Sequence, residues 1–166
     1  MNKDNWQPRI VAFFCNWCTY TAADLAGVSR MKHAPNVRII RLMCSGRVDP
    51  QFILDALARG ADAVLIGGCH PFDCHYAEGN YKCLRRFEML KRMIKDMGIE
   101  EDRIRLEWIS AAEGAKVKTV INEMVARVTS VGAAEEEEAP AVEEGAGEEP
   151  EVIEKGKKEE IEEEKK

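Results

Sequence analysis

The sequence at positions 63–75 reads Ala63-Val64-Leu65-Ile66-Gly67-Gly68-Cys69-His70-Pro71-Phe72-Asp73-Cys74-His75. Its first half is a short apolar run, typical of a strand that is buried on both faces of a sheet. The two cysteines follow where such a strand ends. In open α/β sheets, ligands bind in the crevice beyond the carboxyl ends of the strands. The stretch therefore predicts both an α/β fold and a site at one edge of its sheet.

Three more apolar runs predict the other strands. They lie at residues 10–14, 37–43 and 104–109. Cys15 closes the first run and Cys44 closes the second, as Cys69 closes the stretch quoted above. We expect all of these strands to be buried on both faces, with their cysteines at one edge of the sheet.

Helical patterns separate the strands. Asp49 is a predicted N-cap, Pro50 a predicted first residue and Gly60 the stop of one helix. A second helix is predicted over residues 84–97, and a third follows the capping box Ser110-Ala111-Ala112-Glu113. The second is amphipathic. Its apolar side holds Leu84, Phe87, Leu90, Ile94 and Met97, and its basic side holds Arg85, Lys91, Arg92 and Lys95.

This alternation predicts an α/β fold, namely a four-stranded parallel sheet of β-α units flanked by helices. The C-terminal region differs in composition. Of 24 basic and 30 acidic residues in the chain, 5 Lys and 15 Glu fall in residues 135–166, which leaves 19 basic and 15 acidic residues before them. Such a segment buries too little apolar surface to fold. We therefore predict a folded domain over residues 1–131 and a disordered acidic tail over 132–166.

The N-terminus has only five apolar residues in a row before Cys15, too few for a signal peptide or a membrane span. We expect a cytoplasmic protein without a membrane or nucleic-acid partner. Cytosolic thiols are kept reduced, so six cysteines favour metal binding or catalysis over disulfides. No paired carboxylates, Ser-His-Asp set or phosphate loop signals a catalytic site of its own.

The cysteines leave three chemistries open. Four thiolates of Cys15, Cys18, Cys44, Cys69 and Cys74 would satisfy a 2Fe-2S cluster, with His70 or His75 as less common substitutes. The second alternative is a thioredoxin-like dithiol oxidoreductase that uses Cys15 and Cys18 at a helix start. The third is a zinc-stabilised interaction module. Cys83, on the predicted long helix, is expected to be an ordinary buried residue.

Several motifs together resemble the iron-sulfur delta subunit of the methyl-viologen-reducing nickel-iron hydrogenase of methanogenic archaea. The resemblance covers roughly residues 9–128. It is carried by Cys15-Asn16-Trp17-Cys18, by Cys44-Ser45-Gly46-Arg47-Val48-Asp49-Pro50, by Gly60-Ala61-Asp62-Ala63-Val64, by Gly68-Cys69-His70-Pro71-Phe72-Asp73-Cys74-His75-Tyr76, by Gly79-Asn80 and by Trp108-Ile109-Ser110-Ala111-Ala112-Glu113-Gly114.

The resemblance implies an electron-transfer subunit that carries a 2Fe-2S cluster. Such a protein passes electrons from the small and large hydrogenase subunits, or from formate dehydrogenase, to the flavin of the A subunit of heterodisulfide reductase. We expect Cys15, Cys44, Cys69 and Cys74 as ligands, with Cys18 as the competitor of Cys15 or Cys44. Gly46, Gly68 and His70 are expected to shape the cluster loops. Trp17 and Tyr76 are expected to shield the cluster, to contact a partner or to lie in the core.

Overall fold

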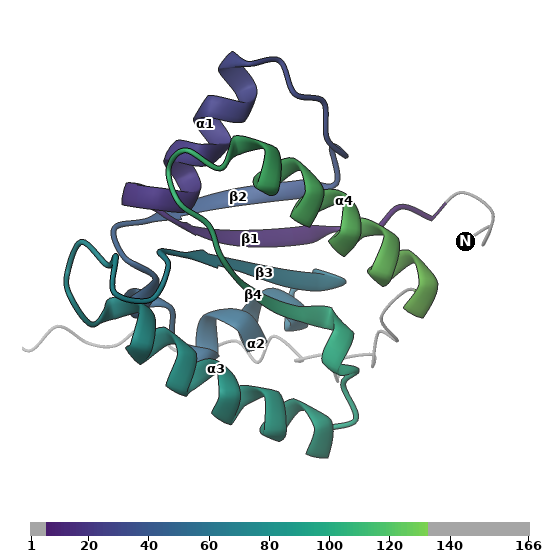
Figure 1. The fold of residues 1–166 in the computed structure, drawn as a ribbon. Coiled ribbons are helices and arrows are strands. Elements are labelled where there is room, and N and C mark those ends of the chain that lie inside the picture. The colour runs from purple at the N-terminus through teal and green to yellow at the C-terminus, as the bar shows by residue number, and fades with distance from the viewer. Residues whose placement is uncertain (1–5, 133–166) are drawn as a thin grey trace, which may run out of the picture. The chain divides into compact units, whose positions relative to one another are not determined.

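The computed structural model describes residues 6–132. Its centre is a parallel four-stranded sheet in the order β2-β1-β3-β4. The predicted fold class is therefore confirmed (Figure 1). The strands are β1 (Ile10–Cys15), β2 (Val37–Leu42), β3 (Ala63–Gly68) and β4 (Ile104–Trp108).

The register of the sheet aligns the carboxyl ends of its strands. Cys15 pairs with Leu42 of β2, and its neighbour Phe14 pairs with Gly67 of β3. Cys44 and Cys69 then follow within two residues of these strand ends. Because β1 lies between β2 and β3, the topology delivers all three cysteines to one edge of the sheet.

Helices cover both faces of the sheet (Figure 1). On one face lie α1 (Thr21–Val28) and α4 (Gly114–Val131), and on the other lie α2 (Pro50–Ala58) and α3 (Gly79–Asp96). Three short helical segments complete the fold: the π-helix η2 (Asn16–Tyr20) and the 3-10 turns η3 (Ser45–Arg47) and η4 (Glu101–Arg103). Among the described helices, none combines the length and the apolar character needed to cross a bilayer.

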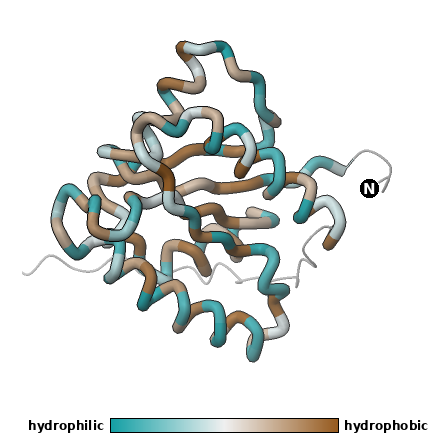
Figure 2. Tube along the Cα trace, in the orientation of Figure 1, coloured by the Kyte–Doolittle hydropathy of each residue, from teal (hydrophilic) through white to brown (hydrophobic). Residues whose placement is uncertain are grey.

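Each face of the sheet has its own core. Phe14 and Leu65 pack toward α4, where Ile121 and Met124 are fully buried. The opposite core joins Ile66 of β3 to α2 and α3. Figure 2 shows hydrophobic residues concentrated along the central strands. The alternation of side chains between two covered faces explains why β1 and β3 are almost wholly buried.

The predicted helix starts were correct in one case and shifted in two. Asp49 caps α2, since its Oδ1 accepts a hydrogen bond of 3.0 Å from the Gln51 amide. However, α3 begins at Gly79 rather than near Leu84, and α4 begins at Gly114 rather than at the capping box. The Glu113 carboxylate does accept from the Ser110 amide, at 2.7 Å. That bond closes a turn that precedes the helix. It is one of the two reciprocal hydrogen bonds that a capping box contains.

Two burial predictions were wrong. The central residues of β2 are exposed, because β2 lies at the edge of the sheet and packs mainly on β1 and η2 rather than under an α-helix. Met97 is also exposed, since it forms the C-cap of α3 and lies beyond the last turn that packs on the sheet. The predicted acidic tail lies outside the described residues. The described part of the chain ends one residue beyond α4, at Gly132.

Candidate metal centre

Three of the predicted ligands form a compact group at the carboxyl edge of the sheet. Cys15 ends β1, Cys18 lies in η2, and Cys69 follows β3. Their sulfur atoms all lie within 4.8 Å of one another, and the Cys15 and Cys69 sulfurs are 3.7 Å apart. All three side chains are buried. Within residues 6–132, this is the only group of three or more Cys, His, Asp or Glu side chains spaced to share one metal ion.

The other two predicted ligands form a pair beside this trio. Cys44 and Cys74 have their sulfur atoms 3.9 Å apart, and both are half-buried. Cys74 also packs against the trio, so it links the two groups. The structure thus brings together all five cysteines that the sequence singled out.

Cys83 lies elsewhere, as predicted. It is 1% exposed and belongs to the core between the sheet, α2 and α3. Burial raises the pKa of its thiol to about 12. A neutral thiol in such surroundings behaves as a small apolar side chain.

The three thiols of the trio differ in their pKa values. Hydrogen bonds from the Cys18 and Cys69 thiols lower the pKa of Cys15, and the same bonds raise the pKa values of Cys18 and Cys69. One thiolate is therefore stabilised at the expense of two neutral thiols. A bound cation would remove this conflict, because thiolates coordinate metals and metal binding displaces thiol protons.

Burial and backbone amides set the pKa values of Cys44 and Cys74. Burial raises the pKa of Cys44, although the Gly46 amide donates a hydrogen bond to its sulfur at 3.4 Å. Burial also acts to raise the pKa of Cys74, but the amides of Tyr76, Asn80 and Gly79 outweigh it and lower that pKa. Two of these amides belong to the first turn of α3, where N–H groups have no partner within the helix.

Two of the predicted loop residues lie where close backbone approach is needed. A β-carbon at Gly46 would lie 2.8 Å from the Gly79 α-carbon, so this contact requires glycine. Gly68 is packed between the Trp108 ring and the Ser45 hydroxyl, and its carbonyl accepts a hydrogen bond of 2.8 Å from the Ile109 amide. Both residues therefore fix the backbone around the cysteines.

His70, the third of these residues, is held by a carboxylate. Its Nε2 lies 2.7 Å from Glu113 Oε2, the same oxygen that accepts from the Ser110 amide. The Ser110 amide and His70 together lower the pKa of Glu113 to about 2. This contact ties the Cys69–Cys74 loop to the loop that precedes α4. His75 is engaged differently, because its ring stacks on Trp17 at 3.8 Å between centroids.

Two further side chains support the site and were not predicted. Asn80 is buried and its amide nitrogen donates to the carbonyls of Cys69 and His70, at 3.4 and 2.8 Å. Arg86, on the next turns of α3, donates to the carbonyls of Gly46 and Val48 at 2.7 and 3.2 Å. The only sequence signal was the pair Gly79-Asn80, two residues of low helix propensity at a helix start.

Three aromatic side chains that lie close to Cys18 and Cys74 in the sequence contact one another. Trp17 donates from Nε1 to the Tyr76 hydroxyl at 3.3 Å, and His75 lies between the two rings. Trp17 is 45% exposed and Tyr76 is 51% exposed. Of the roles expected for them, a place in the core is therefore wrong. They form a partly exposed pair, one residue before Cys18 and two residues after Cys74 in the chain.

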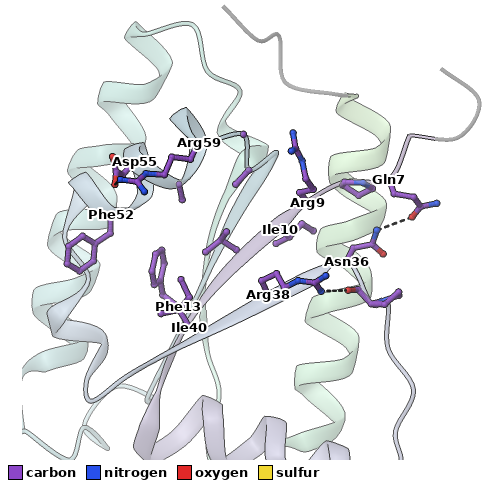
Figure 3. Close-up of a pocket in the computed structure, with 16 residues that line it drawn as sticks. Gln7, Arg9, Ile10, Phe13, Asn36, Arg38, Ile40, Phe52, Asp55 and Arg59 are labelled. Carbon is purple, nitrogen blue, oxygen red and sulfur yellow. Dashed lines mark hydrogen bonds and ion pairs between the residues drawn. The ribbon is translucent and has the colours of Figure 1, made fainter. Parts of the chain in front are cut away.

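A separate groove of about 940 Å³ lies at the opposite end of the strands. Figure 3 shows Phe13 and Ile40 on its sheet side, Phe52 on its helical side, and the Asp55–Arg59 ion pair of 3.2 Å at its margin. None of the six cysteines lines it. The groove is thus distinct from the metal centre.

Comparisons with known proteins agree with this geometry. Residues 10–132 match the family model described as methyl-viologen-reducing hydrogenase, delta subunit. The iron-sulfur D subunit of the vhc F420-non-reducing hydrogenase of Methanococcus voltae is 55% identical over 129 residues, which cover 78% of this chain and 90% of that protein. The iron-sulfur D subunit of the F420-non-reducing hydrogenase of Archaeoglobus profundus is 53% identical over 130 residues, covering 78% and 95%.

A third relative is a much longer protein. The A subunit of the ferredoxin/F420H2-dependent CoB-CoM heterodisulfide reductase of Methanosarcina acetivorans is 50% identical over 125 residues, which are 75% of this chain but only 16% of that protein. A domain similar to this chain is therefore part of a reductase polypeptide in that organism. On the strength of the family match and of these identities, the chain belongs to the FlpD family, the delta subunits of methyl-viologen-reducing hydrogenase.

Proposed function

We propose that this protein is an electron-transfer subunit that carries a 2Fe-2S cluster. Cys15 and Cys69 hold one iron, and Cys44 and Cys74 hold the other. The observation that carries the proposal is the spacing of these two pairs, 3.7 and 3.9 Å between sulfur atoms. Two thiolates on one tetrahedral metal, with bonds of about 2.3 Å, lie about 3.8 Å apart. A two-iron cluster needs two such pairs side by side.

The donor set fits this cofactor better than the alternatives. The site contains five thiols and no histidine spaced to join them, which favours thiolate ligation over a Rieske-type centre. A dithiol made by Cys15 and Cys18 leaves Cys44, Cys69 and Cys74 without a role. The names of the hydrogenase relatives, which call them iron-sulfur subunits, also support iron.

A zinc site is the second candidate, because the trio by itself supports it. Cys15, Cys18 and Cys69 lie close enough to bind one tetrahedral ion, with Cys74 packed against them as a fourth ligand. In that arrangement Cys18 is a ligand. In the two-iron arrangement it is a buried thiol beside the cluster.

The partners that we propose are a nickel-iron hydrogenase, with formate dehydrogenase as an alternative donor, and the A subunit of heterodisulfide reductase, whose flavin receives the electrons. The hydrogenase partner rests on the family and on the hydrogenase names of the relatives. The reductase partner rests on the Methanosarcina protein, in which a similar domain is part of the A subunit of a reductase. We propose a cytoplasmic location, where free thiols remain reduced.

The test is anaerobic purification of the full chain, followed by iron, sulfide and zinc analysis and a visible spectrum. Two iron and two sulfide per chain, with a brown colour, support the proposal. One zinc per chain, or a metal-free protein with a titratable dithiol, contradicts it. Cys74→Ser and Cys83→Ser form a matched pair, since only the first removes a proposed ligand. Co-purification of hydrogenase and reductase subunits from native cells tests the partners separately.

A further inference from the structure

The five-cysteine centre has two unlike ends. Cys15, Cys18 and Cys69 are at most 4% exposed, whereas Cys44 and Cys74 are half-buried. The buried end lies against the central strands. The half-buried end lies between η3, the start of α3 and the loop that holds Cys74. Any charge added to a cluster here would be solvated better at the second end.

Hydrogen bonding differs in the same direction. At the half-buried end, the Gly46 amide donates to the Cys44 sulfur, and the amides of Tyr76, Gly79 and Asn80 act on Cys74. At the buried end, the Cys18 thiol and the amides of Trp17 and Ser45 act on Cys15, but the Cys15 sulfur also lies 3.7 Å from the Met43 carbonyl oxygen. Donors toward sulfur stabilise added negative charge, whereas a carbonyl oxygen opposes it.

The half-buried end also lies at the start of α3, close to backbone that Arg86 holds. Gly79 is the first residue of the 18-residue helix α3, and it contacts both Cys44 and Cys74. The positive end of the helix dipole is therefore directed at this pair. The guanidinium of Arg86 is held at the same end by the carbonyls of Gly46 and Val48. A cationic group held in place near a cluster raises its reduction potential.

We propose that Cys44 and Cys74 hold the end of the centre at which the transferred electron resides. This inference rests on the proposed 2Fe-2S function. Reduction adds one electron from the hydrogenase partner, so one ferric ion becomes ferrous while all four thiolates remain bound and no proton is required. The iron that Cys44 and Cys74 hold is the ferrous one, and Cys15 and Cys69 keep the ferric ion.

The experiment uses the full chain with an ⁵⁷Fe-labelled cluster, reduced with dithionite and studied by Mössbauer and electron paramagnetic resonance spectroscopy. A serine ligand changes the signal of the iron to which it binds. Cys44→Ser is expected to shift the ferrous doublet, and Cys69→Ser is expected to shift the ferric doublet. The reverse pattern would overturn the inference. If the inference fails but the wild-type protein shows two irons with a ferrous and a ferric doublet, the proposed function still stands. A protein without a two-iron cluster contradicts both the proposed function and this inference.

A second set of variants keeps every thiol, in case the serine variants lose iron. Arg86→Gln is expected to lower the reduction potential and to alter the ferrous doublet, while Arg86→Lys recovers most of the wild-type values. Arg92→Gln is the control, because Arg92 lies on the same helix but is exposed. A ferrous doublet that is unchanged in Arg86→Gln, or a change confined to the ferric doublet, contradicts the inference.

Discussion

Gly79 lies so close to Cys44 that a β-carbon at position 79 would overlap the Cys44 sulfur and would lie 3.1 Å from the Cys74 sulfur. Helix propensity does not explain why position 79 is a glycine, because glycine is a poor helix former and other residues suit a helix start at least as well. The contact does, because it lets the first turn of α3 approach both members of the sulfur pair.

Gly79→Ala should therefore displace the pair and reduce iron binding. We expect well under half of the wild-type iron per chain, because Cys44 and the start of α3 cannot both keep their positions. Gly27→Ala is the matched control. A β-carbon at Gly27 meets nothing within 4 Å, so that variant should keep its iron and gain up to about 1 kcal/mol of stability. Equal iron contents in the two variants would contradict the role of Gly79.

The second prediction separates ligand from core cysteines. Cys83→Ala should keep the cluster, since Cys83 packs with Ile66 and Phe87 rather than with the five-cysteine centre. It should cost about 1 kcal/mol in the free energy of unfolding, as small buried truncations do. Cys74→Ser should instead lose iron. Iron analysis and urea unfolding measure the two effects. Iron loss in the Cys83 variant but not in the Cys74 variant would contradict the assignment of Cys74 as a ligand and of Cys83 as a core residue.

The third prediction concerns Glu113 and acid. The folded pKa of Glu113, about 2, lies below its ordinary value of 4.5, so its carboxylate stabilises the fold above about pH 4.5. That contribution is lost as the pH falls toward 2. Glu113→Gln should lower the melting temperature of the metal-free protein by a few degrees at pH 7. The difference from wild type should shrink between pH 4.5 and 3. A constant difference over this range would argue against the carboxylate.

The fourth prediction concerns the basic side of α3. Arg85 and Arg92 are exposed, whereas Lys91 is engaged with Glu101 at 3.1 Å. Surface charges of this kind steer protein association. In the proposed complex with hydrogenase and heterodisulfide reductase, reversing both arginines to glutamate should slow hydrogen-dependent heterodisulfide reduction and weaken its salt dependence.

The control for this reversal is a double variant with the same change in net charge on the other face of the sheet. Lys32→Glu with Lys118→Glu places it beside α1 and on α4, where both side chains are exposed. Both double variants should keep their iron. Equal rates in the two proteins at low salt would show that the basic side of α3 is ordinary surface.

Much of this fold follows from local sequence patterns. The apolar runs that end at Cys15 and Gly68 are short, contain several β-branched or aromatic residues and are bounded by turn residues, which specifies strands without reference to the rest of the chain. Asp49 and Pro50 likewise specify a helix start by their own chemistry. The convergence of Cys15, Cys44 and Cys69 follows from parallel topology alone.

The remaining features depend on tertiary contacts that no local pattern encodes. The start of α3 at Gly79 is set by its approach to Cys44, and the exposure of β2 is set by strand order. Arg86 and Asn80 act on carbonyls up to 40 positions away, so their roles require the folded chain. The division of five thiols into a trio and a pair is also a three-dimensional fact, since all five follow strand ends in similar sequence contexts.

The ligands of the proposed cluster are spread along the chain from Cys15 to Cys74, across three neighbouring strands. Binding all of them to one cofactor closes several long loops at once, and this closure removes conformational entropy from the unfolded chain as a cross-link does. The colour of the cluster would then report on the pairing of β2 with β1 and of β1 with β3. Bleaching during denaturation would mark the moment at which the sheet separates.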